Sequence, residues 1–280
     1  MAKGIALTVG LNAVDPAHYG WDGPLKGCEA DARDMAAIAT AQGFVVSSLL
    51  TQEATREHVQ RALRDAAGAL TAGDIFLLCY SGHGGQLPDL NGDEDDGQDE
   101  TWCLYDGQLV DDEMNLLLAA FAKGVRVLVT ADSCHSGTSV KMAFTEGRSI
   151  SSGVRASASD GRRLDTYRCM PSDVATSTYL ANRDFYDPIL SGDAQAAGAT
   201  PSADVMLISG CQDNQYARDG LFNGLFTGTL KRIWNGGKFA GSYPDFWKAI
   251  GRAMPQEQSP NYFWSTPPNP AFEQQKPFTI

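Results

Sequence analysis

A cysteine and a histidine each follow a run of apolar residues, and together they could perform nucleophilic chemistry. The apolar segment 125–131, "VRVLVTA", continues into "DSCHSG", which contains Cys134. The apolar segment 74–80, "DIFLLCY", continues into "SGHGGQ", which contains His83. A thiol attacks as the thiolate, and a neighbouring imidazole makes that form accessible near neutral pH. Either residue alone is more often structural, but the pair in matching Gly/Ser turns indicates a thiol-dependent enzyme.

The elements that must position these residues alternate between apolar runs and helical patterns. The apolar runs predict buried strands at 3–11, 44–50, 74–80, 125–131 and 204–210. Helical spacing, with acids at the start or glycine at the end, predicts helices at 27–43, 55–70, 111–124, 222–234 and 243–254. This alternation is typical of an α/β protein whose mostly parallel sheet is covered on both faces. His83 and Cys134 then reach one rim of the sheet if their strands are neighbours.

Two segments lack this order. Residues 141–203 are rich in Ser, Ala, Asp, Arg and Gly and show weak periodicity, which predicts a long excursion with little regular structure. The tail from Pro255 holds Pro, Gln, Asn and aromatic residues, and we expect it to pack as an irregular strap.

Composition restricts the classes of partner. The formal net charge is −12, from 22 basic and 34 acidic residues, which argues against nucleic acid and anionic membrane because phosphate binding needs clustered Lys and Arg. The six cysteines form no CxxC and no zinc-ligand spacing. The sequence shows neither a signal-peptide pattern nor an apolar run long enough to span a membrane. We therefore expect a cytoplasmic protein with reduced thiols.

Six short motifs, in order, resemble those of the metacaspases and their prokaryotic relatives in the caspase-like clan. They are "LKGCEADARDM" (25–35), "YSGHGGQ" (80–86), "DGQDE" (96–100), "DDE" (111–113), "DSCHSG" (132–137) and "ISGCQDNQYA" (208–217). The resemblance implies one caspase-like domain over 1–280, a three-layer sandwich with a mostly parallel central sheet. Its parts would be a large-subunit-like region (1–140), the variable excursion (141–203) and a small-subunit-like region (204–280). The Q-A-C-x-G pattern of true caspases is absent.

The resemblance also assigns catalytic roles. Cys134 matches the family's nucleophile and His83 its catalytic imidazole, whereas His135 does not match that position. The backbone amides of Gly84 and Cys134 match the oxyanion hole, where they would hold the negative charge of the intermediate. We expect Ser81 to shape or orient the turn before His83.

Charge predicts the specificity of the site. Asp132 lies two residues before the thiol, and Asp31 follows Cys28 in a motif that the family uses for its specificity pocket. Two carboxylates in one pocket repel each other unless a cation lies between them, which favours Arg or Lys before the scissile bond. Asp213 is a candidate either for a third acid of the pocket or for the lining of a neighbouring subsite, and Cys28 is a candidate packed thiol. Asp31 alone could instead be an acid that complements a helix dipole.

The segment 88–100, "PDLNGDEDDGQDE", is acidic and suggests calcium, which prefers several carboxylate oxygens. It does not match an EF-hand. Many metacaspases use calcium through an acid in this region and the paired aspartates of "DDE", which maps here to Asp99, Glu100, Asp111 and Asp112. The alternatives are a solvated acidic loop and ordinary acids at a helix N-terminus.

The combined prediction is a cysteine endopeptidase that cleaves proteins or peptides after Arg or Lys, stimulated by Ca²⁺ and able to process itself. Several basic residues in 141–203 are candidate self-cleavage positions, among which the sequence does not choose. The resemblance also implies a monomer, since true caspases dimerise through a sheet edge and metacaspases generally do not. Two alternatives remain open: a catalytically silent regulatory or scaffold protein, and a peptidase of the clan that prefers Asn or Asp.

Overall fold

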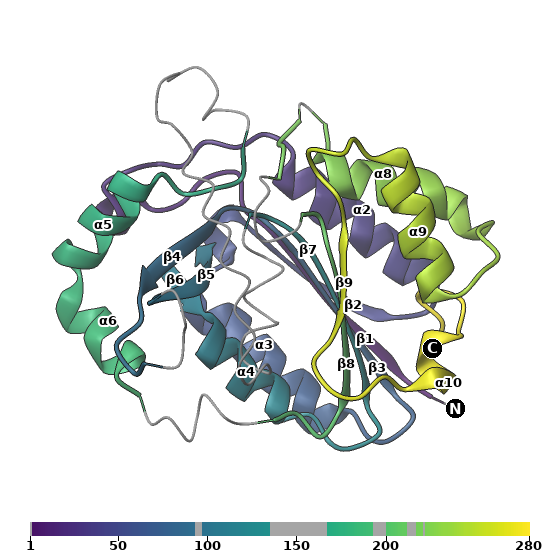
Figure 1. Cartoon of the computed structure of the whole chain (residues 1–280). Coiled ribbons are helices and arrows are strands. Elements are labelled where there is room, and N and C mark those ends of the chain that lie inside the picture. The colour runs from purple at the N-terminus through teal and green to yellow at the C-terminus, as the bar shows by residue number, and fades with distance from the viewer. Residues whose placement is uncertain (1, 93–96, 135–166, 193–199, 212–216, 221) are drawn as a thin grey trace.

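A six-stranded sheet runs through the centre of the molecule in the computed structural model of the chain (Figure 1). The structure describes residues 2–92, 97–134, 167–192, 200–211, 217–220 and 222–280. The strands lie in the order β2-β1-β3-β7-β8-β9, and all except β9 run parallel. Their bounds are β1 Gly4–Gly10, β2 Val45–Leu50, β3 Ile75–Ser81, β7 Arg126–Asp132, β8 Asp204–Ser209 and β9 Asn261–Trp264.

The central strands have the apolar composition that burial on both faces requires. Every residue of β3 and of β7 is buried, which agrees with the continuous apolar runs that predicted them. The outer strand β2 is more polar and partly exposed, with Val45 71% accessible. The five strands expected from the sequence are therefore confirmed, as is the mostly parallel α/β architecture.

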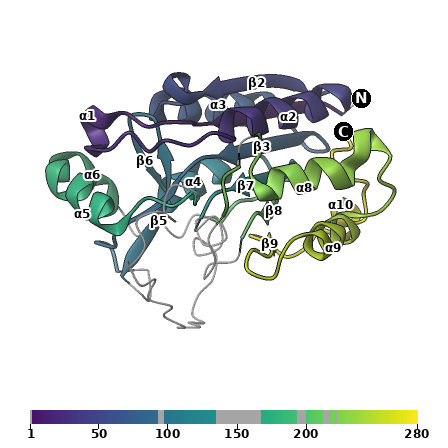
Figure 2. The same cartoon turned by 90° about the horizontal axis from the view of Figure 1, so that it is seen from above.

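Helices cover both faces of this sheet (Figures 1 and 2). One face carries α2 (Cys28–Ala41), α8 (Leu225–Trp234) and α9 (Tyr243–Ala253), and the other carries α3 (Arg56–Ala69) and α4 (Asp111–Ala119). Met35, Leu230 and Phe246 form one apolar core against the sheet, whereas Leu63 and Leu118 belong to the core on the opposite face. Shorter helical segments within the described residues include α1 (Pro16–Tyr19), α10 (Pro270–Glu273) and the 3₁₀ turns η1 (Thr51–Glu53) and η4 (Asn235–Gly237).

A second, antiparallel sheet extends from the end of the central one, and the sequence did not predict it. It consists of β4 (Gly84–Pro88), β5 (Gln98–Leu104) and β6 (Gly107–Val110), in that order. The helices α5 (Ser172–Ala181) and α6 (Arg183–Leu190) lie beside it in Figure 1. They contribute the buried side chains that pack with two residues of the small sheet, in a cluster of Leu87, Val110, Tyr179, Tyr186 and Leu190.

Three other expectations need correction. Part of the 141–203 excursion is regular, since α5 and α6 lie within it. The tail from Pro255 is not wholly irregular, because β9 pairs antiparallel with β8 and α10 follows. The helix expected at 111–124 ends at Ala119. Among the described residues, none of the helices combines the length and the apolar character that a bilayer span needs.

Strand order locates the functional edge of the sheet. β1 lies between β2 and β3, so the chain reverses its direction of travel across the sheet at the β1–β3 pair. Crevices for ligands form beyond the carboxyl ends of strands at such a point. The segments that follow β1, β3 and β7 meet there, and they include the start of α2 and the turn between β3 and β4.

Candidate active site

Strand register brings the predicted cysteine and histidine to the same edge of the sheet. Ser81 and Asp132 are direct partners at the ends of β3 and β7. His83 and Cys134 each follow two residues beyond that pair. Both side chains are buried, so the two reactive groups lie in a protected part of the rim.

Contacts on two sides fix the orientation of His83. Its Nε2 lies 3.1 Å from the carbonyl oxygen of Gly23, and since a carbonyl only accepts, Nε2 carries the proton. The Trp21 ring lies against the imidazole, with the two centroids 4.7 Å apart. Nδ1 is buried without a hydrogen-bond partner in the described part of the chain, which leaves its lone pair available as a base. Burial lowers the pKa of His83 to about 4, so the imidazole is neutral at pH 7.

The thiol of Cys134 packs with two further cysteines, Cys169 and Cys211. Cys211 and Ala217 are buried beside it, and Cys169 packs against this cluster. The amide of Ala217 donates to Sγ at 3.1 Å, and the Cys169 side chain is hydrogen-bonded to the same thiol. Burial, reinforced by Cys169, raises the pKa of Cys134 well above its usual value. The resting site therefore contains a neutral thiol and a neutral imidazole.

Two backbone amides converge on one carbonyl oxygen beside the thiol. The amides of Gly84 and of Cys134 itself both donate to the carbonyl oxygen of Arg168, each at 3.1 Å. A Cβ added to Gly84 would lie 1.9 Å from the carbonyl oxygen of Cys134, so only glycine permits this close approach. These are the two amides that the resemblance assigned to the oxyanion hole.

Residues 167–170 pair with the backbone on two sides of the site, through isolated bridges and hydrogen bonds and not as a strand of either sheet. The Arg168 amide donates to the Ala217 carbonyl at 2.9 Å, and the Met170 amide donates to the Gly84 carbonyl at 2.8 Å. Cys169 forms a parallel bridge with Gly84. Backbone pairing on both sides of one residue is how a cleft holds an extended peptide. The chain therefore places its own Arg168–Cys169 peptide bond beside the Cys134 thiol.

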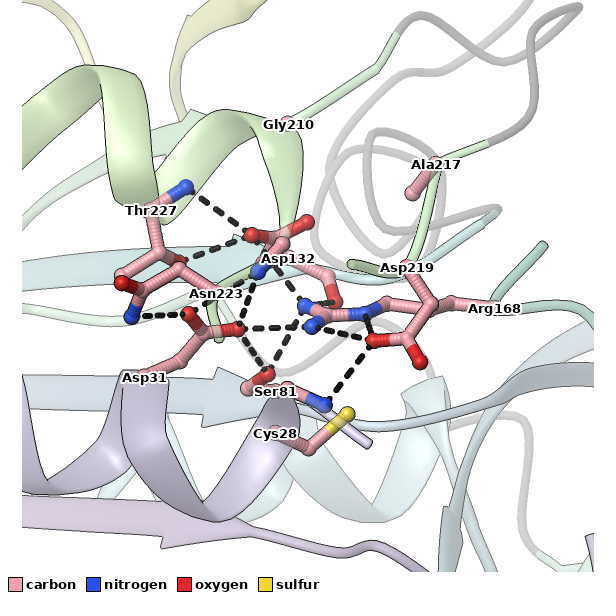
Figure 3. Close-up of polar contacts among 12 residues, drawn as sticks. Cys28, Asp31, Ser81, Asp132, Arg168, Gly210, Ala217, Asp219, Asn223 and Thr227 are labelled. Carbon is pink, nitrogen blue, oxygen red and sulfur yellow. Dashed lines mark hydrogen bonds and ion pairs between the residues drawn. The ribbon is translucent and has the colours of Figure 1, made fainter. Parts of the chain in front are cut away.

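The side chain of Arg168 lies among three carboxylates (Figure 3). Nη2 is 2.7 Å from Asp31 Oδ2 and 3.0 Å from Asp219 Oδ1, and Nη1 is 3.1 Å from Asp132 Oδ2. Nη1 also donates to Ser81 Oγ at 2.8 Å. The guanidinium is fully buried and the three acids are at most 5% exposed. Because buried charges of one sign are costly without a partner, the cation is what allows these acids to remain together.

The first turn of α8 supports two of the acids. The Gly224 amide donates to both oxygens of Asp31, at 3.1 and 3.2 Å. Thr227 donates to Asp132 Oδ2 through its amide at 2.9 Å and its hydroxyl at 2.8 Å. A helix N-terminus favours negative charge. Burial raises the pKa of Asp31 to about 6 although Arg168 opposes the shift.

The structure unites most of the predicted site residues. Asp31, Asp132 and Ser81 meet at the Arg168 guanidinium, and Ser81 therefore does more than shape a turn. Cys28 lies beside them in Figure 3 and is buried, and burial raises the pKa of its thiol to about 12, so this thiol is neutral at pH 7. Asp213, predicted as the third acid, lies outside the described residues.

Two residues at the centre of this site were not predicted from the sequence. The third carboxylate at the guanidinium is Asp219, in a stretch where no motif marks it. The occupant of the pocket is Arg168, one of several basic residues in the excursion. No motif in the sequence distinguishes Arg168 from the other basic residues of the excursion.

The four acids predicted for calcium lie together at one end of the small sheet. Asp99 and Glu100 are consecutive in β5, so their side chains face opposite sides of the sheet. Asp111 and Asp112 begin α4 directly after β6, the neighbour of β5. Within the described ranges, no three His, Cys, Asp or Glu side chains converge as metal ligands. The calcium site therefore stays a prediction.

Comparison with known proteins agrees with this geometry. A family profile described as "Caspase domain" matches residues 3–275. The chain belongs to the caspase-domain family. The chain is 29% identical over 247 residues to Metacaspase-1 of Ajellomyces capsulatus and 31% identical over 249 residues to Metacaspase-1 of Pyricularia oryzae. The crystal structure of protein GSU0716 from Geobacter sulfurreducens is similar, with a TM-score of 0.86, 55% identity and 99% of each chain covered.

Family membership places the chain among the metacaspase-like cysteine peptidases. The alignments cover 80% of this chain in both metacaspases, but 68% of the Ajellomyces protein and 61% of the Pyricularia protein. The chain therefore matches roughly two thirds of the length of each fungal protein.

Proposed function

We propose that this caspase-domain protein is a cysteine endopeptidase that cleaves after Arg or Lys and cuts its own chain between Arg168 and Cys169. The observation that carries the proposal is the position of Arg168. Its side chain fills an acidic pocket, and its carbonyl oxygen receives the amides of Gly84 and Cys134. A substrate arginine needs both contacts at once: the pocket selects the residue, and the amides prepare its carbonyl for attack.

The chemistry follows from the protonation states. His83 Nδ1 accepts the proton of the Cys134 thiol, and the sulfur attacks the carbonyl carbon of the residue in the pocket. The two amides hold the oxyanion. His83 then delivers the proton to the leaving amine, and water hydrolyses the thioester, which releases the new carboxylate and restores the thiol.

With residues 167–170 bound at the site, we expect the uncut protein to react slowly. With residues 167–170 in place, burial raises the pKa of Cys134 and lowers that of His83, and both shifts disfavour the thiolate–imidazolium pair. Cleavage of the Arg168–Cys169 bond would free the strand to leave and admit water and substrate. We propose that self-processing activates the enzyme in this way.

Peptide reporters test the proposal directly. Purified protein is given reporters that end in Arg, Lys, Asp or Asn, beside the Cys134→Ala variant. We expect turnover of the Arg and Lys reporters, and none by the variant. Turnover after Asp or Asn would indicate a different pocket, and silence on all four reporters would indicate a regulatory or scaffold role.

Calcium stimulation is a separate proposal. Its support is that acids of β5 and of the start of α4 lie on neighbouring elements, and Ca²⁺ prefers several carboxylate oxygens. Titration calorimetry with Ca²⁺ should show binding that is weakened in Asp111→Asn/Asp112→Asn and retained in Asp65→Asn, which removes an exposed acid on α3. Equal binding by all three proteins would place any calcium site elsewhere.

We also propose that the enzyme is a cytoplasmic monomer. The support is that the six cysteines are free thiols, as in a reducing compartment, together with the likeness to metacaspases. Light scattering of the purified chain gives its mass in solution, and a dimer would contradict the proposal.

A further inference from the structure

Asp219 contacts a part of the guanidinium that the other two acids do not. Its Oδ1 lies 3.3 Å from Arg168 Nε and 3.0 Å from Nη2. Asp31 accepts from Nη2, and Asp132 lies at Nη1. The three acids therefore divide the cation: two bind its terminal nitrogens, and Asp219 binds along the side that carries Nε (Figure 3).

The backbone before α2 holds Asp219 in place. The Lys26 amide donates to Oδ2 at 2.8 Å and the Gly27 amide donates to Oδ1 at 3.2 Å. A Cβ added to Gly27 would lie 3.1 Å from Arg168 Nη2, so the backbone here approaches both the acid and the cation. Because two amides already fix the carboxylate, it loses little conformational entropy when a substrate side chain binds. Its hydrogen bond then favours a donor that lies at the right position.

Lysine cannot use this carboxylate as arginine does. The Nζ of an extended lysine falls near the position of the arginine Cζ. A methylene group of lysine takes the place of Nε. The N–H group that donates to Asp219 from this position in arginine is therefore absent in lysine. The ammonium is also about one bond length short of the positions of Nη1 and Nη2. A buried acid left without a donor is costly, and a site built for one hydrogen-bond pattern rejects the analogue that lacks it.

We propose that Asp219 makes the pocket select arginine over lysine. This inference rests on the proposed function, because it assumes that a substrate arginine binds in the pocket as Arg168 does. Asp31 and Asp132 then provide the general preference for a cation. Asp219 is the specificity-determining residue, because it accepts a hydrogen bond from the Nε–H group that only arginine has.

The test compares kcat/KM for three reporters that differ only before the scissile bond. They end in Arg, in Lys, or in an arginine isostere that has a methylene in place of Nε and keeps the terminal amidine. Wild-type protein should prefer Arg to the isostere by about tenfold, since a hydrogen bond to a charged group is lost. In Asp219→Asn both the Arg-to-isostere and the Arg-to-Lys ratios should fall toward one. A ratio within one sample is independent of the fraction of protein that has been activated.

A matched control removes an acid from the same neighbourhood. Asp34 lies on α2 and binds Asn223 and Lys231, but it does not touch the guanidinium in the described contacts. Asp34→Asn should leave both ratios unchanged, which separates a direct contact from a general loss of negative charge. A fall of equal size in Asp34→Asn would overturn the role given to Asp219.

The two proposals can fail separately. If wild-type protein ignores both basic reporters, the proposed function fails. If it cleaves them but treats Arg and the isostere alike, Asp219 is not the reader of Nε, and this result needs no variant to fold. Unchanged ratios in a folded Asp219→Asn protein, checked by circular dichroism, would also refute the inference.

Discussion

Two groups of acids in this protein differ in how the chain assembles them. The pocket acids, Asp31, Asp132 and Asp219, come from distant parts of the sequence and surround one buried guanidinium. The small-sheet acids, Asp99, Glu100, Asp111 and Asp112, come from the ends of neighbouring elements in one stretch of chain. Bringing distant buried carboxylates together is unfavourable without a cation. The first group therefore surrounds a cation that the chain itself supplies, whereas the second group comes from a single stretch of chain.

The largest expected difference between the groups is in catalysis. Asp132→Asn should lower kcat/KM for Arg reporters on the order of a hundredfold, because one charge partner of a buried ion pair is removed. Asp112→Asn should change it by no more than a few fold at a Ca²⁺ concentration that saturates both proteins. Steady-state kinetics on folded variants measures kcat/KM for both proteins. A comparable loss of kcat/KM in the two variants would show that the two groups of acids do not differ in their role in catalysis.

The second difference is in stability. In a Cys134→Ala background, which keeps the chain uncut, Arg168→Met leaves the pocket acids without their cation and should lower the free energy of unfolding by about 3 kcal/mol. Arg183→Met, which breaks the exposed pair with Asp187, should cost less than about 0.5 kcal/mol.

Denaturant unfolding of the two variants provides the measurement. Adding Asp31→Asn to Arg168→Met should recover part of the loss, since one of the repelling charges is gone. Strict additivity of the two substitutions would show that the acids do not depend on the cation.

The smallest expected effect is a pH dependence. The folded-state pKa of His83, about 4, lies below its usual 6.5, so the folded protein binds fewer protons than the unfolded chain between these values. Stability from neutral His83 is complete above pH 6.5 and is lost as pH falls toward 4, by about 2 kcal/mol between pH 7 and 5.

Asp31 acts in the opposite direction, because its folded pKa of about 6 is raised and its ionisation above that pH opposes folding. The contribution of Asp31 cancels when two variants that both keep Asp31 are compared. The difference in unfolding free energy between Cys134→Ala and Cys134→Ala/His83→Asn should shrink from pH 7 to pH 5. A difference that is constant with pH would mean that the imidazole is not buried in the neutral form.

The sequence predicted what depends on local pattern. Apolar runs located β1, β3 and β7, and the polar turns after two of them located His83 and Cys134. The small sheet was missed because β4 begins with Gly84 and Gly85, which read as a turn. The helix α6 was missed because Pro188 lies inside it. Asp219 and Arg168 reach the pocket through long connections, so the sequence could indicate an acidic pocket but not its complete membership.

Self-cleavage tests the central claim most directly: Cys134 attacks a carbonyl positioned as that of Arg168 is. Intact-mass spectrometry of wild-type, Cys134→Ala and Arg168→Gln proteins follows each chain over time. The account predicts fragments 1–168 and 169–280 from wild type only, with Cys134→Ala uncut and Arg168→Gln lacking that cut. Cleavage at the same bond in Cys134→Ala, or wild-type protein that is cut only at other positions, would contradict it.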